Sequence, residues 1–230
     1  MAASAATPTA DASRTPSMPA SHTVWTIGTS VQGRPIVAET FGQGSRRVLI
    51  LGGIHGNEFG GPVVEAFLGY VRAHPSVVPS GTELDIVPFA NPDGQSSNSR
   101  ANARNVDINR NFPARDWSRV LNLHGTSPGV SPGSEPETQA LLMLLDTQRY
   151  ARVVSLHSHG GLIDWDGAGG WTLARHVGKA AHVRLVRLKS YDGSMGSLVP
   201  ERYHIPVVTW ELSRSSFDWR IREGLLAALR

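Results

Sequence analysis

The alternation of apolar and polar residues predicts that strands and helices follow one another along the chain. Residues 23–42, TVWTIGTSVQGRPIVAETFG, alternate around a glycine and predict a β-hairpin. The apolar run RRVLILGGI then predicts a buried strand. Helical spacing of apolar residues follows Pro62, a residue suited to the first turn of a helix. The next strand is expected over residues 82–90, TELDIVPFA, before the turn NPDG.

The second half of the chain continues this pattern. Ser134 and Glu137 have the spacing of a capping box ahead of an apolar helix, and ARVVSLH (151–157) predicts a strand. Glycines crowd residues 160–170. The remaining expected elements are a helix near 172–182, a strand near 183–188, a strand at 205–212 and a C-terminal helix with Phe217, Ile221, Leu225 and Leu229 on one face.

Strands that alternate with helices indicate an α/β fold with a mixed, mostly parallel sheet flanked by helices. The chain has 230 residues, which suits a single domain with a substantial core. Hydrophobic residues make up 40% and charged residues 18% of the sequence, the balance of a soluble globular protein. No apolar run reaches membrane-spanning length, so no membrane partner is expected.

Charge and cysteine content narrow the possible chemistry. The formal net charge is +3 and the basic residues are scattered, so a nucleic-acid partner is not expected. Cysteine is absent, which excludes disulfides, thiolate catalysis and cysteine-ligated metal sites. Any metal ion must therefore be held by histidine, aspartate or glutamate. The sequence does not indicate an oligomeric state.

The N-terminal residues differ from the rest of the chain. Residues 1–22 are mostly small, polar and broken by proline, and we expect a disordered tail followed by one folded domain over 23–230. The tail lacks the basic start and continuous apolar segment of a secretory signal. The expected location is the cytoplasm, unless a misassigned start hides an export signal.

Three ionisable residues stand where predicted strands end. His55 follows VLILGGI, His157 closes ARVVSLH, and Glu211 lies near the end of IPVVTWEL. Ligands of open α/β sheets bind beyond the carboxyl ends of the strands, so we expect these residues to meet at one edge. His55 and Glu58 are three residues apart in GGIHGNEFGG, a spacing that lets both side chains hold one ion.

Two histidines and one carboxylate are the protein ligands of a catalytic zinc site whose fourth position stays open. The glycines around HGNE let the backbone bend sharply and keep bulk away from an ion. The alternative is a loop histidine beside an unrelated acid, which a lone HxxE motif does not exclude.

The ordered set HGNE, NPDG, VDINRNFP, SEPET, SLH and WEL resembles the zinc carboxypeptidase superfamily over residues 27 to about 214. RANARNVDINRNFPARDW, PGSEPETQAL and the short chain look most similar to its murein peptide amidase A subgroup. The resemblance implies a zinc carboxypeptidase-like fold, of the phosphorylase/hydrolase-like kind, and one zinc ion per chain. Members of that subgroup cut the bond between γ-D-glutamate and meso-diaminopimelate in peptides recovered from the cell wall.

The resemblance also implies a role for each residue of the metal site. Zinc would be bound by His55, Glu58 and His157. Glu211 would act as general base and proton shuttle. Asp107 matches the carboxylate that accepts a hydrogen bond from the zinc-bound ring of His55. From the sequence alone, Glu211 is also compatible with a surface ion pair, and Asp107 with a simple turn.

Substrate-binding residues are implied in the same way. Arg100 matches the arginine that stabilises the oxyanion, and Asn109 with Arg110 matches the pair that holds the free carboxylate of the last substrate residue. Tyr191 resembles the mobile tyrosine that closes over the substrate terminus, and Leu198 falls where side-chain preference is set. The alternative for Tyr191 is an exposed loop residue.

The leading hypothesis is a zinc-dependent amidase that releases meso-diaminopimelate from L-Ala-γ-D-Glu-meso-diaminopimelate, a small peptide substrate. Polar groups would have to hold the amphoteric leaving residue, and Asp192, Glu201 and His159 are the candidates. Alternatives are a carboxypeptidase for ordinary peptides and an N-acyl amino acid deacylase of the succinylglutamate desuccinylase or aspartoacylase type. A fourth hypothesis is an inactive zinc-binding scaffold that recognises cell-wall peptides.

Overall fold

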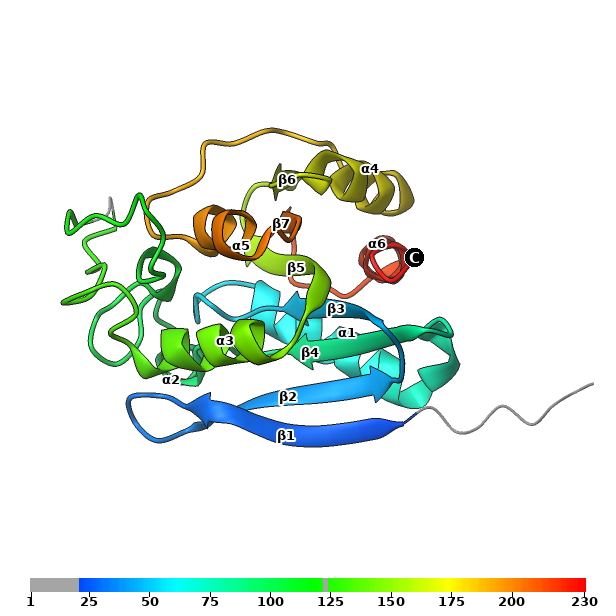
Figure 1. The fold of residues 1–230 in the computed structure, drawn as a ribbon, viewed down its shortest axis with the longest axis horizontal. Coiled ribbons are helices and arrows are strands. Elements are labelled where there is room, and N and C mark those ends of the chain that lie inside the picture. The colour runs from blue at the N-terminus through cyan, green and yellow to red at the C-terminus, as the bar shows by residue number, and fades with distance from the viewer. Residues whose placement is uncertain (1–20, 122–123) are drawn as a thin grey trace, which may run out of the picture.

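A computed structural model describes residues 21–121 and 124–230, and shows a seven-stranded sheet with helices on both faces (Figure 1). The strands are β1 His22–Thr29, β2 Pro35–Gly42, β3 Arg46–Leu51, β4 Thr82–Val87, β5 Tyr150–Ser158, β6 Leu162–Asp166 and β7 Val207–Leu212. The α-helices are α1 Gly60–Ala73, α2 Pro92–Ser97, α3 Pro136–Thr147, α4 Gly170–Ala181, α5 Met195–Tyr203 and α6 Trp219–Ala227. Two short 3-10 helices are η1 Pro75–Val77 and η2 Ile108–Arg110.

The sheet is mixed, and its centre is parallel. The strand order is β1-β2-β4-β3-β5-β7-β6, in which β4, β3, β5 and β7 run parallel to one another. The N-terminal hairpin and the edge strand β6 pair with their neighbours in the antiparallel sense. The predicted α/β fold, a mixed sheet flanked by helices, is confirmed. The carboxyl ends of the four parallel strands open at one edge of the sheet, where ligands of such folds bind.

One apolar cluster lies on each face of the sheet. The first contains Phe67 of α1, Leu173 of α4 and Leu225 of α6, and the second contains Leu141 of α3 and Leu198 of α5. Central parallel strands are covered on both faces, so most of their side chains are apolar. Asp85 within β4 and Ser155 within β5 are buried exceptions.

Residues 183–188 do not form the strand that their alternation predicted. Leu185 makes only an isolated bridge to Ile163, and the strand beside β7 is β6, which lies inside the glycine-rich stretch. Because β6 already occupies the hydrogen-bonding edge of β7, residues 183–188 can only pass along its outer side.

The capping box predicted at Ser134 and Glu137 is wrong. The residue at the N-cap of α3 is Glu135, and no side chain caps the helix. The Ser134 hydroxyl donates to the Glu135 carboxylate at 2.7 Å, while Oε1 of Glu137 accepts from the Val31 amide at 3.0 Å. Ser134 thus bonds to the next residue along the chain and Glu137 to a distant amide, so neither side chain caps the helix.

Helix α5 also differs from the prediction, because the sequence pattern did not indicate a helix after Tyr191. Ser194 caps it by accepting a hydrogen bond from the Ser197 amide at 3.1 Å, and Met195 and Val199 are buried on one face. The helix contains Pro200 near its end. Glycine and proline lower helix propensity, and tertiary packing overrides that preference here.

The folded region begins slightly before the predicted boundary at residue 23. His22 opens β1, and the Ser21 hydroxyl donates to the carbonyl of Gly42 at 2.7 Å. The rest of the predicted tail, residues 1–20, lies outside the described residues. None of the helices in the described ranges is both long and apolar enough to cross a membrane.

Candidate metal centre and active-site cavity

Close backbone contacts explain the glycines of the HGNE loop, which follows β3. A Cβ on Gly56 would lie 1.9 Å from the carbonyl carbon of Gly94, and a Cβ on Gly60 would lie 2.0 Å from the carbonyl oxygen of Leu156. Real Cβ atoms do not approach backbone atoms this closely, so glycine is required at both positions. The loop is thereby pressed against α2 on one side and β5 on the other.

The NPDG sequence, predicted as a turn, forms the N-cap and the first residues of helix α2 and braces the same loop. Asn91 donates through Nδ2 to the carbonyl oxygen of Ile54 at 3.2 Å, next to the HGNE sequence. The buried carboxylate of Asp93 accepts from the Ser30 hydroxyl at 2.7 Å and from the Gln32 amide at 2.9 Å. This motif therefore ties the loop after β3 and the turn of the β1–β2 hairpin to the start of α2.

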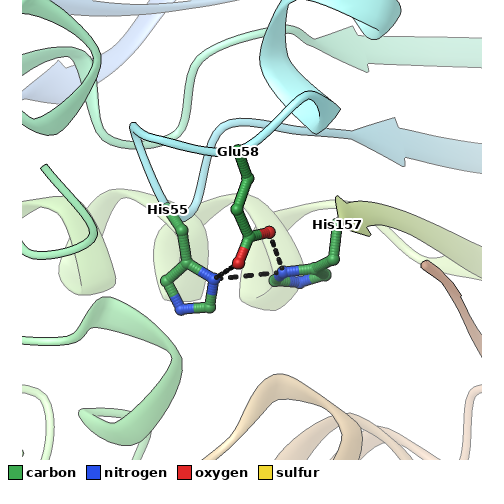
Figure 2. Close-up of side chains that lie close together, drawn as sticks. All are labelled: His55, Glu58 and His157. Carbon is green, nitrogen blue, oxygen red and sulfur yellow. Dashed lines mark hydrogen bonds and ion pairs between the residues drawn. The ribbon is translucent and has the colours of Figure 1, made fainter. Parts of the chain in front are cut away.

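Three side chains converge at the carboxyl ends of β3 and β5 (Figure 2). Nδ1 of His55 lies 2.8 Å from Oε1 of Glu58, and Nδ1 of His157 lies 3.0 Å from Oε2 of the same carboxylate. The two Nδ1 atoms are 3.2 Å apart. All three side chains are buried. The fold thus brings His157 into contact with Glu58 and His55, which precede it by 99 and 102 residues in the sequence.

This donor set fits a zinc ion. Nε2 of His55 lies 2.9 Å from the Asp107 carboxylate and donates a hydrogen bond to it, which leaves the Nδ1 lone pair directed toward Glu58 and His157. Ligands at about 2.1 Å from a tetrahedral zinc lie about 3.4 Å from one another, close to the observed separations. Imidazole and carboxylate are also zinc's usual protein ligands when cysteine is absent.

Burial and charge oppose each other at this group. Burial would raise the pKa of the Glu58 carboxyl, but His157 and His55 outweigh burial and hold that pKa well below its usual range. Burial would likewise raise the pKa of Asp107, and His55 and Arg100 outweigh it and lower the pKa. Two ionised carboxylates in a buried site make an environment that favours a bound cation.

Arg100 contacts both carboxylates of this group. Its Nε lies 3.0 Å from Oδ2 of Asp107, and its Nη1 lies 3.1 Å from Oε1 of Glu58. The side chain is 18% exposed and lines the cavity in front of the metal group. The guanidinium is therefore fixed beside the centre with part of its surface open to a ligand.

Glu211 stands beside the metal group on the neighbouring strand. It pairs with His157 in the register of β7 against β5, and its side chain lines the same cavity. Burial is the main cause that raises the pKa of the Glu211 carboxyl. A Cβ on Gly160 would lie 2.9 Å from the Cβ of Glu211, so the glycine-rich stretch leaves room for this side chain.

Asn109, Arg110 and Tyr191 lie together at another wall of the cavity. The Arg110 guanidinium carbon lies 4.3 Å from the centre of the Tyr191 ring, and Nη1 donates to the Asn109 carbonyl at 2.6 Å. Burial lowers the pKa of Arg110, which remains a cation at neutral pH. Oδ1 of Asn109 accepts from the Met195 amide at 2.9 Å and so ties this wall to α5.

Three residues that the sequence suggested for side-chain recognition lie outside the cavity. Leu198 is 1% exposed in the core beneath α5 and does not line the cavity, so it cannot contact a substrate side chain. His159 is exposed and meets the ring of Phe59 edge-on at 4.8 Å, outside the cavity. Glu201 pairs with the exposed Arg115 at 2.7 Å and is also outside it, whereas Asp192 does line the cavity.

The cavity has a volume of about 630 Å³ and contains polar residues that the sequence motifs did not indicate. Asp164 and Asp166 of β6 and Thr209 of β7 line it beyond Glu211. The signal for these residues was the alternation in LIDWD, which places both aspartates on one face of a strand. The surrounding glycines concealed that strand.

The chain belongs to the zinc carboxypeptidase family, whose family model matches residues 14–168. The matched region contains His55, Glu58 and His157 and ends before Glu211. Family membership and the three converging ligands define the protein as a zinc-dependent hydrolase.

Several of the similar proteins are murein peptide amidases. Murein peptide amidase A of Vibrio campbellii is 32% identical over 218 residues, which cover 86% of this chain and 82% of that protein. Murein peptide amidase A of Escherichia coli K12 is 37% identical over 142 residues, 56% of this chain and 57% of that protein. The structure of murein-tripeptide amidase from Escherichia coli O157 matches with a TM-score of 0.71 at 30% identity, covering 90% of this chain and 89% of that one. Carboxypeptidase A from Helicoverpa armigera matches with a TM-score of 0.75 at 19% identity over 90% of this chain and 67% of its own, a likeness of fold alone.

Proposed function

We propose that the protein is a zinc-dependent amidase that hydrolyses the bond between γ-D-glutamate and meso-diaminopimelate in murein peptides, as part of cell-wall peptide recycling. The observation that carries this proposal is one cavity lined by the metal group, by Glu211 and by the Arg110–Tyr191 pair. The two murein amidases that align over most of the chain support the choice of substrate. The catalytic domain would comprise the sheet and helices from β1 to α6.

In this proposal His55, Glu58 and His157 hold the zinc ion. When bound, zinc polarises the scissile carbonyl and makes a water in the cavity more acidic. Asp107 keeps the ring of His55 in the tautomer that leaves Nδ1 available. Arg100, at the same end of the cavity, stabilises the negative charge that develops on the carbonyl oxygen.

Glu211 moves the proton. It accepts a proton from the attacking water and donates it to the nitrogen of diaminopimelate as the amide C–N bond breaks. A carboxyl whose pKa is raised by burial suits a group that must both take up and release a proton. The products are L-Ala-D-Glu, with a new carboxylate, and free diaminopimelate.

Arg110 and Asn109 bind the substrate terminus. The guanidinium pairs with the carboxylate next to the scissile amide, and the amide side chain of Asn109 adds a hydrogen bond. Tyr191, 59% exposed and stacked on Arg110, closes over the bound residue. Recognition of a free terminal carboxylate restricts the enzyme to the last residue of a peptide.

The direct test is to incubate zinc-loaded protein with L-Ala-γ-D-Glu-meso-diaminopimelate and to identify the products by mass. We expect L-Ala-D-Glu and diaminopimelate, formed faster than a hydrophobic residue is released from an ordinary peptide. Faster cleavage of the ordinary peptide would remove the cell-wall substrate, and activity on N-acyl amino acids alone would favour a deacylase.

The matched control is Glu211→Gln. It should retain zinc and lower kcat by about 10²- to 10⁴-fold, the usual contribution of a general acid-base group. A wild-type protein as inactive as this variant, with zinc bound in both, would instead support the scaffold hypothesis.

A further inference from the structure

A short loop connects Arg100 to Asp107, two residues that contact the metal group. Arg100 donates to Asp107, and each of them also bonds to one of the proposed metal ligands, so the chain between them turns back on itself. The positions of both side chains therefore depend on the shape of residues 101–106. Asn102 lies in this loop, is buried, and has no part in the mechanism above.

The oxygen of the Asn102 side chain closes the loop. Oδ1 accepts from the backbone amides of Arg104 and Val106, each at 3.0 Å. The Asn102 amide donates to the Val106 carbonyl at 2.9 Å, and the Asn102 carbonyl accepts from the Asn105 amide at 3.0 Å. Asn105 has a φ of 58°, a conformation that asparagine adopts more readily than most residues. Hydrogen bonds to Asn102 thus set the turn that leads into Asp107.

Two buried glutamates hold the nitrogen of the same Asn102 side chain. Nδ2 donates to Oε2 of Glu135 at 2.8 Å and to Oε2 of Glu137 at 3.0 Å. A flipped amide would direct its oxygen at two carboxylates, so these contacts assign the orientation of the side chain. The glutamates therefore keep Oδ1 of Asn102 directed at the amides of the loop.

Each glutamate also has a partner outside the loop. Oε1 of Glu135 accepts from the Ser134 hydroxyl at 2.7 Å, and Oε1 of Glu137 accepts from the Val31 amide at 3.0 Å. Burying a carboxylate is costly unless its oxygens accept hydrogen bonds, so Asn102 and the two glutamates stabilise one another in one arrangement. The SEPET sequence at the start of α3 is thereby connected to the loop.

We infer that Asn102, held by Glu135 and Glu137, is a positioning residue that sets the places of the Arg100 guanidinium and the Asp107 carboxylate beside the metal group. The inference rests on the proposed amidase function and gives the SEPET sequence a part in it. Asn102 and the two glutamates do not line the cavity, so they act through Arg100 and Asp107. A misplacement of about 1 Å in a group that acts on the transition state can lower the rate about 100-fold.

Asn102→Ala tests this role, because it removes every hydrogen bond of the side chain. With L-Ala-γ-D-Glu-meso-diaminopimelate we expect kcat to fall by about 10-fold or more and KM to stay within about 3-fold, since the oxyanion site moves and the site for the substrate terminus is held separately through α5. Zinc affinity, measured without substrate by competition with a chelator, should fall by about 10-fold.

The outcomes separate this inference from the proposed function. A folded Asn102→Ala variant with the kcat and zinc affinity of the wild type would overturn the inference and leave the amidase function standing. A wild-type protein that binds zinc but does not hydrolyse the tripeptide would overturn the proposed function, and the zinc affinities would still decide the inference.

Variants of Glu135 separate positioning from a general loss of stability, and they take the place of Asn102→Ala if that protein does not fold. Glu135→Gln keeps an oxygen for Asn102 and presents its NH2 group to the Ser134 hydroxyl, so kcat and zinc affinity should stay within about 3-fold of wild type. Glu135→Ala leaves a buried N–H of Asn102 without its acceptor and should lower both by about 5-fold or more.

Gln139→Ala is the control on the same helix. It removes an exposed hydrogen bond from Nε2 of Gln139 to the Gly133 carbonyl at 3.1 Å, and it should change neither kcat nor zinc affinity. Equal kcat and equal zinc affinity in Glu135→Ala and Glu135→Gln would contradict the inference.

Discussion

At the scale of single residues, Asp107 joins the metal group to the substrate-binding residues. Its Oδ1 accepts from Nε2 of His55 and from the Asn109 amide, both at 2.9 Å, and its Oδ2 accepts from Nε of Arg100 at 3.0 Å. The carboxylate is completely buried. The Asp107 side chain thus fixes the tautomer of His55, the start of η2 and the position of the Arg100 guanidinium.

Asp107→Asn tests that role. The asparagine amide has one acceptor oxygen, and its NH2 group can only donate, so either His55 or Arg100 loses its hydrogen-bond acceptor. We expect zinc affinity to fall by about 10- to 100-fold, measured by competition with a chelator of known affinity. Asp146→Asn, on α3 with a side chain 44% exposed, serves as the control. Equal zinc affinity in Asp107→Asn and wild type would contradict the assigned contact.

Residues with a recognisable motif were within reach of the sequence, and residues without one were not. HGNE and SLH indicated the three side chains that converge in Figure 2. Asp164 and Asp166 carry no motif, and only the strand register brings them to the cavity. Leu198 was assigned to the pocket by position in a motif, whereas its burial depends on a helix that glycine and proline made hard to predict.

At the scale of elements, the loop after β3 and the hairpin turn depend on close packing with α2. Gly56 has no room for a side chain against Gly94, while Gly69 on α1 has no atom within 4 Å of its Cβ position. Substitution of Gly56 therefore tests a packing requirement, whereas substitution of Gly69 tests helix propensity alone. Asp93 forms the second link, because its carboxylate holds the turn between β1 and β2.

Gly56→Ala should destabilise the protein by about 2 kcal/mol or more, since a Cβ would overlap backbone atoms. In a chain of this size that lowers Tm by about 5 °C or more. Gly69→Ala is the matched control and should raise stability by about 1 kcal/mol, because alanine is the better helix former. Thermal unfolding of both variants, with and without zinc, provides the measurement. Equal Tm values for Gly56→Ala and wild type would show that the loop can yield.

Asp93→Asn tests the hairpin link through its pH dependence. Burial would raise the pKa of Asp93, but the donors Ser30, Gln32 and Arg34 outweigh it and lower the pKa below the ordinary value of 3.8. A lowered pKa in the folded state means that the stabilisation is fully present above about pH 3.8 and is lost as the pH falls through the lower folded value.

We therefore expect Asp93→Asn to be less stable than wild type by about 1–3 kcal/mol at pH 7. The gap should narrow below pH 4, because only the wild type loses a charge there. Urea unfolding of the metal-free proteins at several pH values measures the gap. A difference that stays constant or widens on acidification would exclude the ionised carboxylate as its cause.

The periodic spacing of apolar residues predicted the order of most strands and helices correctly. It was less successful for the elements at the edge of the sheet. The hairpin, the central strands and the helices α1, α3, α4 and α6 lie where periodicity indicated them. A strand was expected at residues 183–188, but β6 is the strand that pairs with β7. Both segments alternate apolar and polar residues, so only tertiary packing decides which of them joins the sheet. The local capping motif failed for the same reason, since distant amides attract the Glu137 carboxylate.

At the scale of the whole molecule, the cavity assembles residues from segments that are far apart in the sequence. The loop after β3, the end of β5, strands β6 and β7 and the segment before α5 all line it. A ligand that binds only the assembled site stabilises the folded chain as a whole. Zinc should therefore act on global stability as well as on catalysis.

The most direct measurement is a zinc titration of chelator-treated protein, followed by release of diaminopimelate from L-Ala-γ-D-Glu-meso-diaminopimelate. We predict that activity is absent in the metal-free protein, rises in proportion to added zinc and saturates at one equivalent per chain. His157→Ala should show neither tight zinc binding nor activity, because two remaining ligands hold the ion weakly. Full activity in the metal-free protein, or a His157→Ala variant that titrates like the wild type, would contradict the account.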